Sequence, residues 1–149
     1  MCKIVWLDDE PESISYEKNV LIPDKFSQKK IDIYLCETID ELLEKITQDD
    51  FDEKSILLID IMLLSEESFT IPAGDKIPIE NDLMAGTILY REYLRDNFPS
   101  NPIILYTSRE HEKDIFNHIT NDEKYNQTLF LLEKSKKDTD LLEVLSKFI

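Results

Sequence analysis

The sequence predicts an α/β fold built on a doubly wound parallel sheet. Five short apolar runs are spread along the chain, and four of them are continuously apolar, as strands covered on both faces should be. Segments with helical spacing of apolar residues lie between these runs. Strands that alternate with helices favour a parallel sheet with right-handed crossovers. The predicted strands are Lys3–Leu7, Ile31–Leu35, Ile56–Ile59, Ile103–Tyr106 and Leu129–Leu132.

Capping and stop signals place the predicted helices between the strands. Thr38 and Glu41 form a capping box in front of apolar residues that continue to Ile46. The second strand alternates through Asp32, which suits an edge position. The other predicted helices are Glu12–Leu21 (ended by Pro23), Ala85–Tyr93 (stopped before Pro99), a weaker one at Ile115–Ile119, and Leu141–Ile149 behind a cap at Asp138 or Thr139.

Composition limits both the architecture and the partners. A length of 149 residues, with 42% hydrophobic and 33% charged residues, predicts one folded domain over residues 1–149. A net charge of -15 argues against direct binding to nucleic acid or to anionic membranes. No apolar run approaches the ~20 residues that span a bilayer, and MCKIVWLDDE does not resemble a signal peptide. We therefore expect a cytoplasmic protein, with Cys2 and Cys36 as reduced thiols.

The chain contains only two glycines, Gly74 and Gly86. Neither a dinucleotide-binding GxGxxG motif nor a P-loop can be built from them, which excludes these two nucleotide-binding classes. One connection is unusually long, because an extended loop over residues 63–82 separates the third strand from the next helix. Ordinary β-to-α loops have ~2–6 residues. We expect this loop to act as a lid or a partner-specific surface, or else to be a disordered insertion.

Polar side chains follow the predicted strands at the edge where sites of such sheets form. They are Asp8, Asp9 and Glu10 after the first strand, Asp60 after the third, Thr107 and Ser108 after the fourth, and Glu133 and Lys134 after the fifth. Clustered carboxylates favour a hard cation such as Mg²⁺. A carboxylate beside the metal can attack phosphorus, while Lys134 neutralises the phosphoryl oxygens and Thr107 donates a hydrogen bond to one of them. We expect Asp60 to stand at the open mouth of its strand and not to be buried.

Each of these residues also has a simpler interpretation. Asp60 could cap a turn, and the acids after the first strand could only begin a helix. Lys136 and Lys137 are alternatives to Lys134, and either Thr107 or Ser108 could be a helix cap. His111 and His118 lie seven residues apart without a third ligand, so we interpret them as surface residues.

The motifs IVWLDDE, LLIDIM, LYTS and LLEKS, in this order, resemble a response-regulator receiver domain of the CheY-like superfamily, and the resemblance covers essentially the whole chain. It implies a flavodoxin-like five-stranded sheet with strand order 2-1-3-4-5. It also implies that Asp60 is the phosphoacceptor, and that Asp9, Asp60 and the backbone carbonyl of Met62 bind Mg²⁺ with help from Asp8. By the same resemblance, Thr107 is the switch hydroxyl and Lys134 contacts the phosphate. Gly86 matches the glycine that opens the third helix.

Three features depart from the family pattern. The loop after Asp60 is longer, Ser135 replaces the usual proline after the lysine, and Leu131 stands where the switch aromatic is expected, with Phe130 beside it. The acceptor pocket matches the family, whereas the relay away from it differs.

Three functional hypotheses follow. The leading one is a stand-alone receiver in a two-component phosphorelay, a phosphoprotein that forms an aspartyl phosphate with at most self-phosphorylation and autodephosphorylation activity. It would accept the phosphoryl group from a histidine kinase or phosphotransfer protein. It would signal as a monomer or homodimer to a protein partner through the face of the fourth helix, fifth strand and fifth helix. The second is a receiver-like interaction module that works without phosphorylation. The third is an aspartyl-nucleophile phosphohydrolase, in which Met62 occupies the position that the haloacid-dehalogenase pattern gives to an aspartate.

Overall fold

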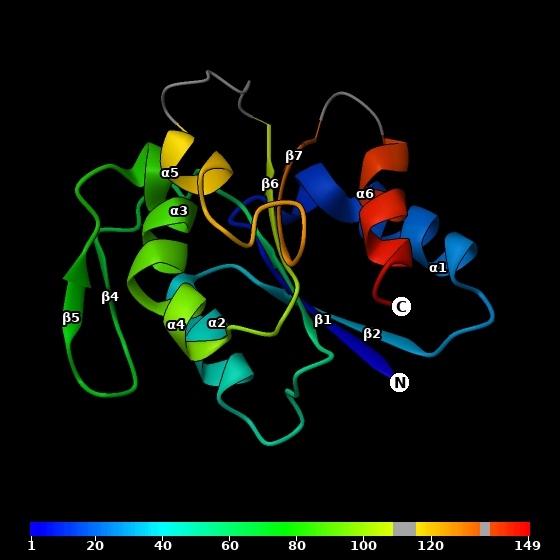
Figure 1. Cartoon of the computed structure of the whole chain (residues 1–149), viewed down its shortest axis with the longest axis horizontal. Coiled ribbons are helices and arrows are strands. Elements are labelled where there is room, and N and C mark those ends of the chain that lie inside the picture. The colour runs from blue at the N-terminus through cyan, green and yellow to red at the C-terminus, as the bar shows by residue number, and fades with distance from the viewer. Residues whose placement is uncertain (109–115, 135–137) are drawn as a thin grey trace.

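Five parallel strands form the central sheet of the computed structural model, which describes residues 1–108, 116–134 and 138–149. Their order is β2-β1-β3-β6-β7, which confirms the predicted strand order and the flavodoxin-like fold (Figure 1). The strands are β1 Cys2–Leu7, β2 Ile31–Cys36, β3 Ile56–Ile59, β6 Ile103–Thr107 and β7 Leu129–Glu133. Each predicted strand is confirmed to within one residue at either end.

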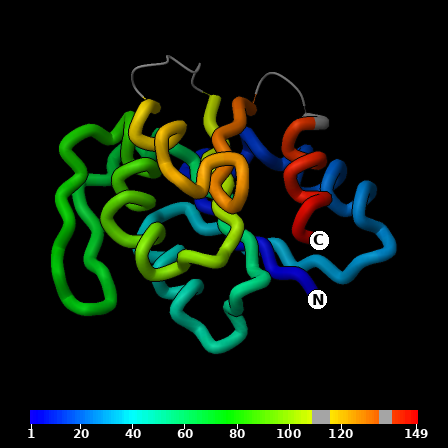
Figure 2. The backbone as a smooth tube through the Cα atoms, viewed as in Figure 1, coloured from blue at the N-terminus to red at the C-terminus, as the bar shows by residue number. Residues whose placement is uncertain are grey.

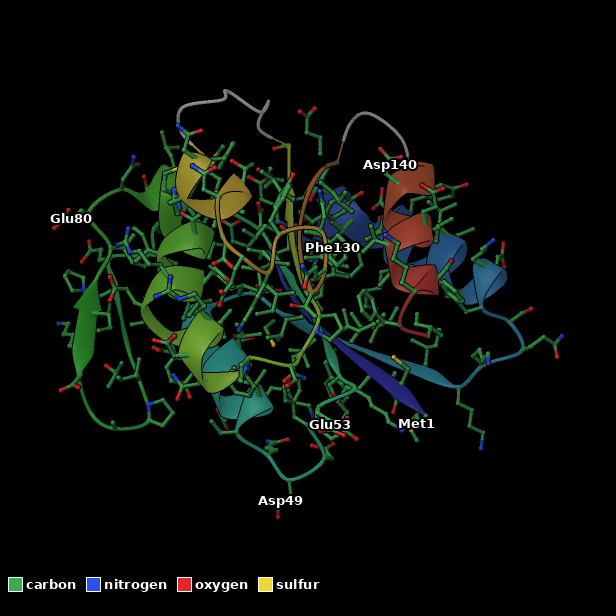
Figure 3. The ribbon with its side chains drawn as sticks, viewed as in Figure 1. Met1, Asp49, Glu53, Glu80, Phe130 and Asp140 are labelled. Carbon is green, nitrogen blue, oxygen red and sulfur yellow. The ribbon has the colours of Figure 1, made fainter. Side chains whose placement is uncertain are left out.

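Helices cover the two faces of the sheet as separate layers (Figure 1). Alternate residues of one strand point to opposite faces, so Val5 and Leu7 pack in one apolar cluster while Ile4 and Trp6 pack in the other. The first face is covered by α2 Ile39–Ile46, α3 Ala85–Leu89, α4 Arg95–Asn97 and α5 Asn117–Thr120, and the second by α1 Ile22–Lys25 and α6 Asp138–Ser146. Phe130 lies between the sheet and α6, against the ring of Phe148 (Figure 3). None of the helices within the described residues is long and apolar enough to cross a membrane.

The predicted helix over Glu12–Leu21 differs from the observed one. The segment begins as a 3-10 turn at Pro11–Ile14, becomes a π-helical turn at Glu17–Leu21, and continues as α1 through Pro23. The prediction that Pro23 ends the helix is therefore wrong. Proline lacks the N–H that a helix interior needs, and the wider π turn before it shifts the hydrogen-bond register. A second π turn, Tyr90–Leu94, joins α3 to α4, which ends at Asn97, so the helix stops before Pro99 as predicted.

The long loop between β3 and α3 is an ordered β-hairpin. Strands β4 Ser68–Thr70 and β5 Lys76–Pro78 are antiparallel, and Phe69, which is 1% exposed, packs in the same apolar cluster as α2. The alternative of a disordered insertion is therefore wrong. The hairpin runs beside α3 with its turn directed away from the carboxyl edge of the sheet (Figure 2), and Glu80 lies on its outer side (Figure 3).

Candidate functional site

Main-chain hydrogen bonds extend the sheet by one residue at its carboxyl edge, and this fixes three polar residues. Asp8 N donates to Cys36 O at 3.0 Å, and Asp60 N donates to Leu7 O at 2.9 Å. Lys134 N donates to Thr107 O at 2.7 Å. The backbones of these residues are therefore held as firmly as the strands, which is the arrangement that positions reactive groups well.

Three carboxylates meet at this edge. Asp8, Asp9 and Asp60 each offer an oxygen, and these atoms all lie within 4.8 Å of one another. Among the described residues no other group of acids, histidines or cysteines has this arrangement. Like charges at this separation repel one another and need a cation to balance them.

Lys134 supplies part of that balance. Its Nζ donates to Asp8 Oδ2 at 2.6 Å and to Asp60 Oδ2 at 3.2 Å. The second oxygen of each carboxylate accepts a main-chain N–H, from Glu10 at 2.8 Å for Asp8 and from Met62 at 3.3 Å for Asp60. Asp9 makes no such contact with the lysine, and its Oδ2 accepts the N–H of Leu64 at 2.9 Å.

Asp60 is buried, so the expectation that it stands unburied at the mouth of its strand is wrong. Its residue is 6% exposed, and Asp8 is fully buried. Helix α3 lies close to the backbone at this point, and its first turn donates Gly86 N to Ile61 O at 2.9 Å. A methyl group at Gly86 would lie 2.2 Å from the carbonyl oxygen of Asp60. Glycine is thus required because α3 rests on the backbone of the two residues that follow β3.

Burial and charge shift the ionisation of the cluster. Burial raises the pKa of Asp60 to about 6, the charge of Lys134 opposes this rise, and the charge of Asp8 adds to it. Burial would lower the pKa of Lys134, but the charge of Asp60 and the hydrogen bond to Asp8 outweigh it, so this pKa is raised. Burial also raises the pKa of Asp9, against the hydrogen bond from Leu64. Near neutral pH, therefore, Asp60 is mainly ionised and the lysine is a cation.

A cavity of about 180 Å³ opens onto the cluster. It is lined by Asp9, Glu10, Ser13, Asp60, Met62, Leu64, Ser108 and Lys134. Three carboxylates, with no cysteine or histidine among the lining residues, form a donor set that suits a hard divalent cation rather than a soft one. The residues that could hold such an ion are Asp8, Asp9 and Asp60, and Met62 is on the cavity wall.

The remaining predicted residues fall in different places. Thr107 is fully buried at the end of β6, next to the exposed Ser108. His118 lines a separate cavity with Arg95 and Asp122. His111, Ser135, Lys136 and Lys137 lie outside the described residues.

Sequence reasoning did not identify the contacts made by Leu64 and Glu66. The N–H of Leu64 reaches Asp9 because the chain turns sharply at residues 63–66, where Glu66 N donates to Leu63 O at 3.4 Å. Ser65 has a φ of 71° in this turn, a left-handed conformation that serine seldom adopts. No sequence signal announces such a turn in the way that a glycine would.

The order of the five parallel strands and the helices on both faces are those of receiver-like α/β folds. Solved response regulators share the fold. One from Desulfuromonas acetoxidans is 14% identical over 99% of this chain and 95% of its own, with a TM-score of 0.58. The N-terminal domain of a response regulator/sensory box/GGDEF protein from Carboxydothermus hydrogenoformans is 13% identical over 97% of this chain and 91% of its own, with a TM-score of 0.55.

RcsB from Salmonella enterica serovar Typhimurium, solved bound to a promoter in the presence of the phosphomimetic BeF3-, is 19% identical over 99% of this chain, with a TM-score of 0.61. This chain covers 67% of the RcsB chain. No family model and no curated protein matches the sequence. The chain thus has the fold of response-regulator receiver domains.

Proposed function

We propose that this protein is a receiver that accepts a phosphoryl group on Asp60 in a Mg²⁺-dependent reaction and signals through protein–protein contacts. One observation carries the proposal: on a receiver fold, Lys134 bridges Asp8 and Asp60 within a cluster of three carboxylates. A structural ion pair needs one acid for one base. The two additional carboxylates have a use if a divalent cation joins them.

Each residue has a defined task in this reaction. Asp8, Asp9 and Asp60 would hold Mg²⁺ with the carbonyl of Met62, and the ion supplies charge neutralisation for the phosphoryl oxygens. An oxygen of Asp60 attacks phosphorus in the donor, and the bond from phosphorus to the donor nitrogen or oxygen breaks. An imidazole nitrogen that leaves takes up a proton from solvent, whereas the carboxylate of a small acyl phosphate leaves as the anion. Lys134 neutralises charge on the transferred group, and Thr107 donates a hydrogen bond to it. The product is an aspartyl phosphate on Asp60.

The donor class follows from the chemistry of the product. An acyl phosphate is formed readily only from a donor of comparable reactivity, such as a phosphohistidine or a small acyl phosphate. We therefore propose a histidine kinase or phosphotransfer protein as the partner upstream. The added group carries about -1.5 to -2 charges, enough to bias a two-state surface, for which we propose the face of α5, β7 and α6.

Intact mass spectrometry tests this proposal. The protein is incubated with Mg²⁺ and acetyl phosphate, and we expect one added phosphoryl group, which requires Mg²⁺. Asp60→Asn should abolish the adduct. Asp50→Asn is the matched control, because Asp50 is a partly exposed aspartate bound to a lysine at the other end of the sheet, and it should leave the adduct intact. An adduct that survives Asp60→Asn would contradict the assignment.

A second function, a receiver-like module that works without phosphorylation, is favoured by the end of β7. Leu131 is only 6% exposed and belongs to the cluster under α2 and α3, while Phe130 packs against Phe148 on the opposite face. Neither offers the switch aromatic that the resemblance implies. The two functions differ in one result, because binding of a protein partner is unchanged by Asp60→Asn only in the module that works without phosphorylation.

A further inference from the structure

The turn at residues 63–66, which forms the base of the β4–β5 hairpin, connects three parts of the molecule that a short loop would not connect. Leu64 N donates to Asp9 Oδ2 at 2.9 Å, and Leu63 N donates to Asp82 O at 3.1 Å, just before α3. Ile39 N, the first N–H of α2, donates to Glu66 Oε1 at 3.0 Å. Three residues of one four-residue turn therefore contact the acid cluster, the segment before α3 and the start of α2.

Glu66 is the side chain that anchors this turn to α2. The cap of α2 is already provided locally, since Thr38 Oγ1 accepts from Glu41 N at 3.2 Å. Glu66 satisfies a further N–H of the helix end, which has four such donors without intrahelical partners. Burial raises the pKa of Glu66, the hydrogen bond from Ile39 opposes this, and the charges of Asp40 and Asp9 add to the rise. The carboxylate of Glu66 is thus close enough to the acid cluster to be repelled by the charge of Asp9.

The turn is also held in a conformation that it would not adopt alone. Ser65 is one of two non-glycine residues with positive φ among the described residues. Such backbone persists only where the surrounding contacts over-determine it. Those contacts are Glu66 on one side of Ser65 and Leu64 on the other. Beyond them, the hairpin itself is secured separately by Phe69 in the core.

We propose that the base of the hairpin is a positioning device for the metal site, in which Glu66 fixes the 63–66 turn on α2 so that the N–H of Leu64 orients the carboxylate of Asp9. Asp9 is the one member of the cluster that Lys134 does not hold in the hydrogen bonds described, so the Leu64 N–H is the contact from another residue that orients it. A ligand carboxylate that is held by one oxygen presents the other to the ion. Glu66 is a positioning residue and does not touch the reacting atoms. The inference rests on the proposed function through the Mg²⁺ that Asp9 would bind.

Substitutions at two neighbouring glutamates separate positioning from charge. Glu66→Ala removes the anchor and one negative charge. Glu67→Ala removes the same charge from an exposed neighbour whose side chain has no hydrogen bond to any of the described residues. Glu66→Gln removes the charge but keeps an oxygen that can accept from Ile39. Mg²⁺ affinity is measured by calorimetric titration of the full chain, and the exchange rate of the Leu64 amide is measured by NMR in protein without metal.

We expect Glu66→Ala to weaken Mg²⁺ binding roughly tenfold, the lower end of what outer-shell partners of metal ligands contribute. The Glu67→Ala and Glu66→Gln variants should stay within about twofold of each other and of the wild type. The Leu64 amide should exchange roughly tenfold faster in Glu66→Ala, and at the wild-type rate in Glu67→Ala.

The two measurements distinguish the possible failures. Equal Mg²⁺ affinities in Glu66→Ala and Glu67→Ala, with an unchanged Leu64 amide, would overturn the positioning device and leave the proposed function standing. A wild-type chain that binds no Mg²⁺ would overturn the proposed function and, with it, the role of the turn in metal binding. A faster Leu64 amide in Glu66→Gln than in Glu67→Ala would overturn the role of the Glu66–Ile39 hydrogen bond.

Discussion

Two clusters of lysine and aspartate stand at opposite ends of β1, and they balance their charges in opposite ways. At the carboxyl edge, Lys134 faces Asp8 and Asp60, with Asp9 beside them. At the amino edge, Lys3 binds Asp50, and the ammonium of Lys45 lies 3.8 Å from the same carboxylate. One cation serves three acids in the first cluster, whereas two cations share one acid in the second.

The environment of the acids differs as much as their number. The side chain of Asp50 is 55% exposed, and the hydrogen bond from Lys3 is the main cause of its lowered pKa. Burial dominates at Asp60 and raises its pKa to about 6 in spite of Lys134. The ammonium of Lys45, the second cation of the cluster at the amino edge, also lies 3.6 Å from the centre of the Tyr34 ring. A lysine–aspartate pair does not by itself indicate a functional site. A cluster of buried acids that outnumber their cations does indicate one.

The largest expected effect comes from removing the lysine of each cluster. Lys134→Met should destabilise the protein by about 3 kcal/mol at pH 7.5, because it leaves buried carboxylates without a cation. Lys3→Met should have a much smaller effect, since Asp50 remains in contact with water and with Lys45. Urea denaturation measures both. Equal losses of unfolding free energy in the two variants would contradict the difference in burial between the two clusters.

A second contrast concerns the two glycines. Gly86→Ala should destabilise the protein by about 2–3 kcal/mol, because the methyl group would overlap the backbone of Asp60 and α3 would have to shift. Gly74→Ala places a methyl group in open space, and only the strained φ of +101° opposes it, at about 1 kcal/mol. The same denaturation experiment compares them. In addition, Gly86→Ala alone should lower the yield of the phosphoryl adduct. A larger loss of stability for Gly74→Ala would contradict the close approach of α3 to the backbone of Asp60.

The sign of the pKa shift at Asp60 gives a third prediction. A raised pKa means that the folded protein still binds a proton between about pH 4 and 6, where the unfolded chain has lost it, so wild-type stability falls as the pH rises through that range. Asp60→Asn removes this cost and should stabilise the metal-free protein by about 1–2 kcal/mol at pH 7.5, with little change at pH 4.5.

Asp50→Asn provides the control of opposite sign. The lowered pKa of Asp50 contributes stability above its unfolded value near pH 4, and that contribution is lost as the pH falls through the folded pKa. The substitution should therefore slightly destabilise the protein at pH 7.5. Denaturation curves over a pH series measure whether each substitution raises or lowers the stability. Destabilisation by Asp60→Asn at pH 7.5 would contradict the raised pKa of Asp60.

The sheet was predictable from the sequence because its strands are continuously apolar. Runs such as Ile56–Ile59 are long enough to be strands and too short to be helices, and capping residues such as Thr38 mark where helices begin. The path through Pro23 was not predictable, because a π turn leaves no pattern that differs from that of an ordinary helix. The hairpin was missed for a similar reason: its strands have three residues each, and Phe69 is the one residue within them that is buried.

The candidate site likewise has features that the sequence predicts and features that it does not predict. Asp8, Asp60 and Lys134 come directly after strands, so strand order alone predicts that they meet. The burial of Asp60 and the close approach of α3 at Gly86 become visible only in three dimensions. The Leu64 contact depends on the backbone angle of Ser65, a conformation that its residue type disfavours. Sequence therefore predicts which groups meet, and packing decides their charge and orientation.

A stability measurement with Mg²⁺ tests whether the carboxylates in excess of Lys134 bind a metal ion. Mg²⁺ at about ten times its dissociation constant should stabilise the wild type by about 1.4 kcal/mol, because only the folded chain assembles the cluster. Asp60→Asn should lose most of this gain, and Asp50→Asn should keep all of it. Thermal unfolding with and without Mg²⁺ measures the difference, with Ca²⁺ as a comparison for selectivity. A gain that persists in Asp60→Asn would place the ion elsewhere on this acidic chain. A gain confined to an intact Asp60 would mean that the carboxyl edge is the one end of β1 where a further cation is needed to balance the charge.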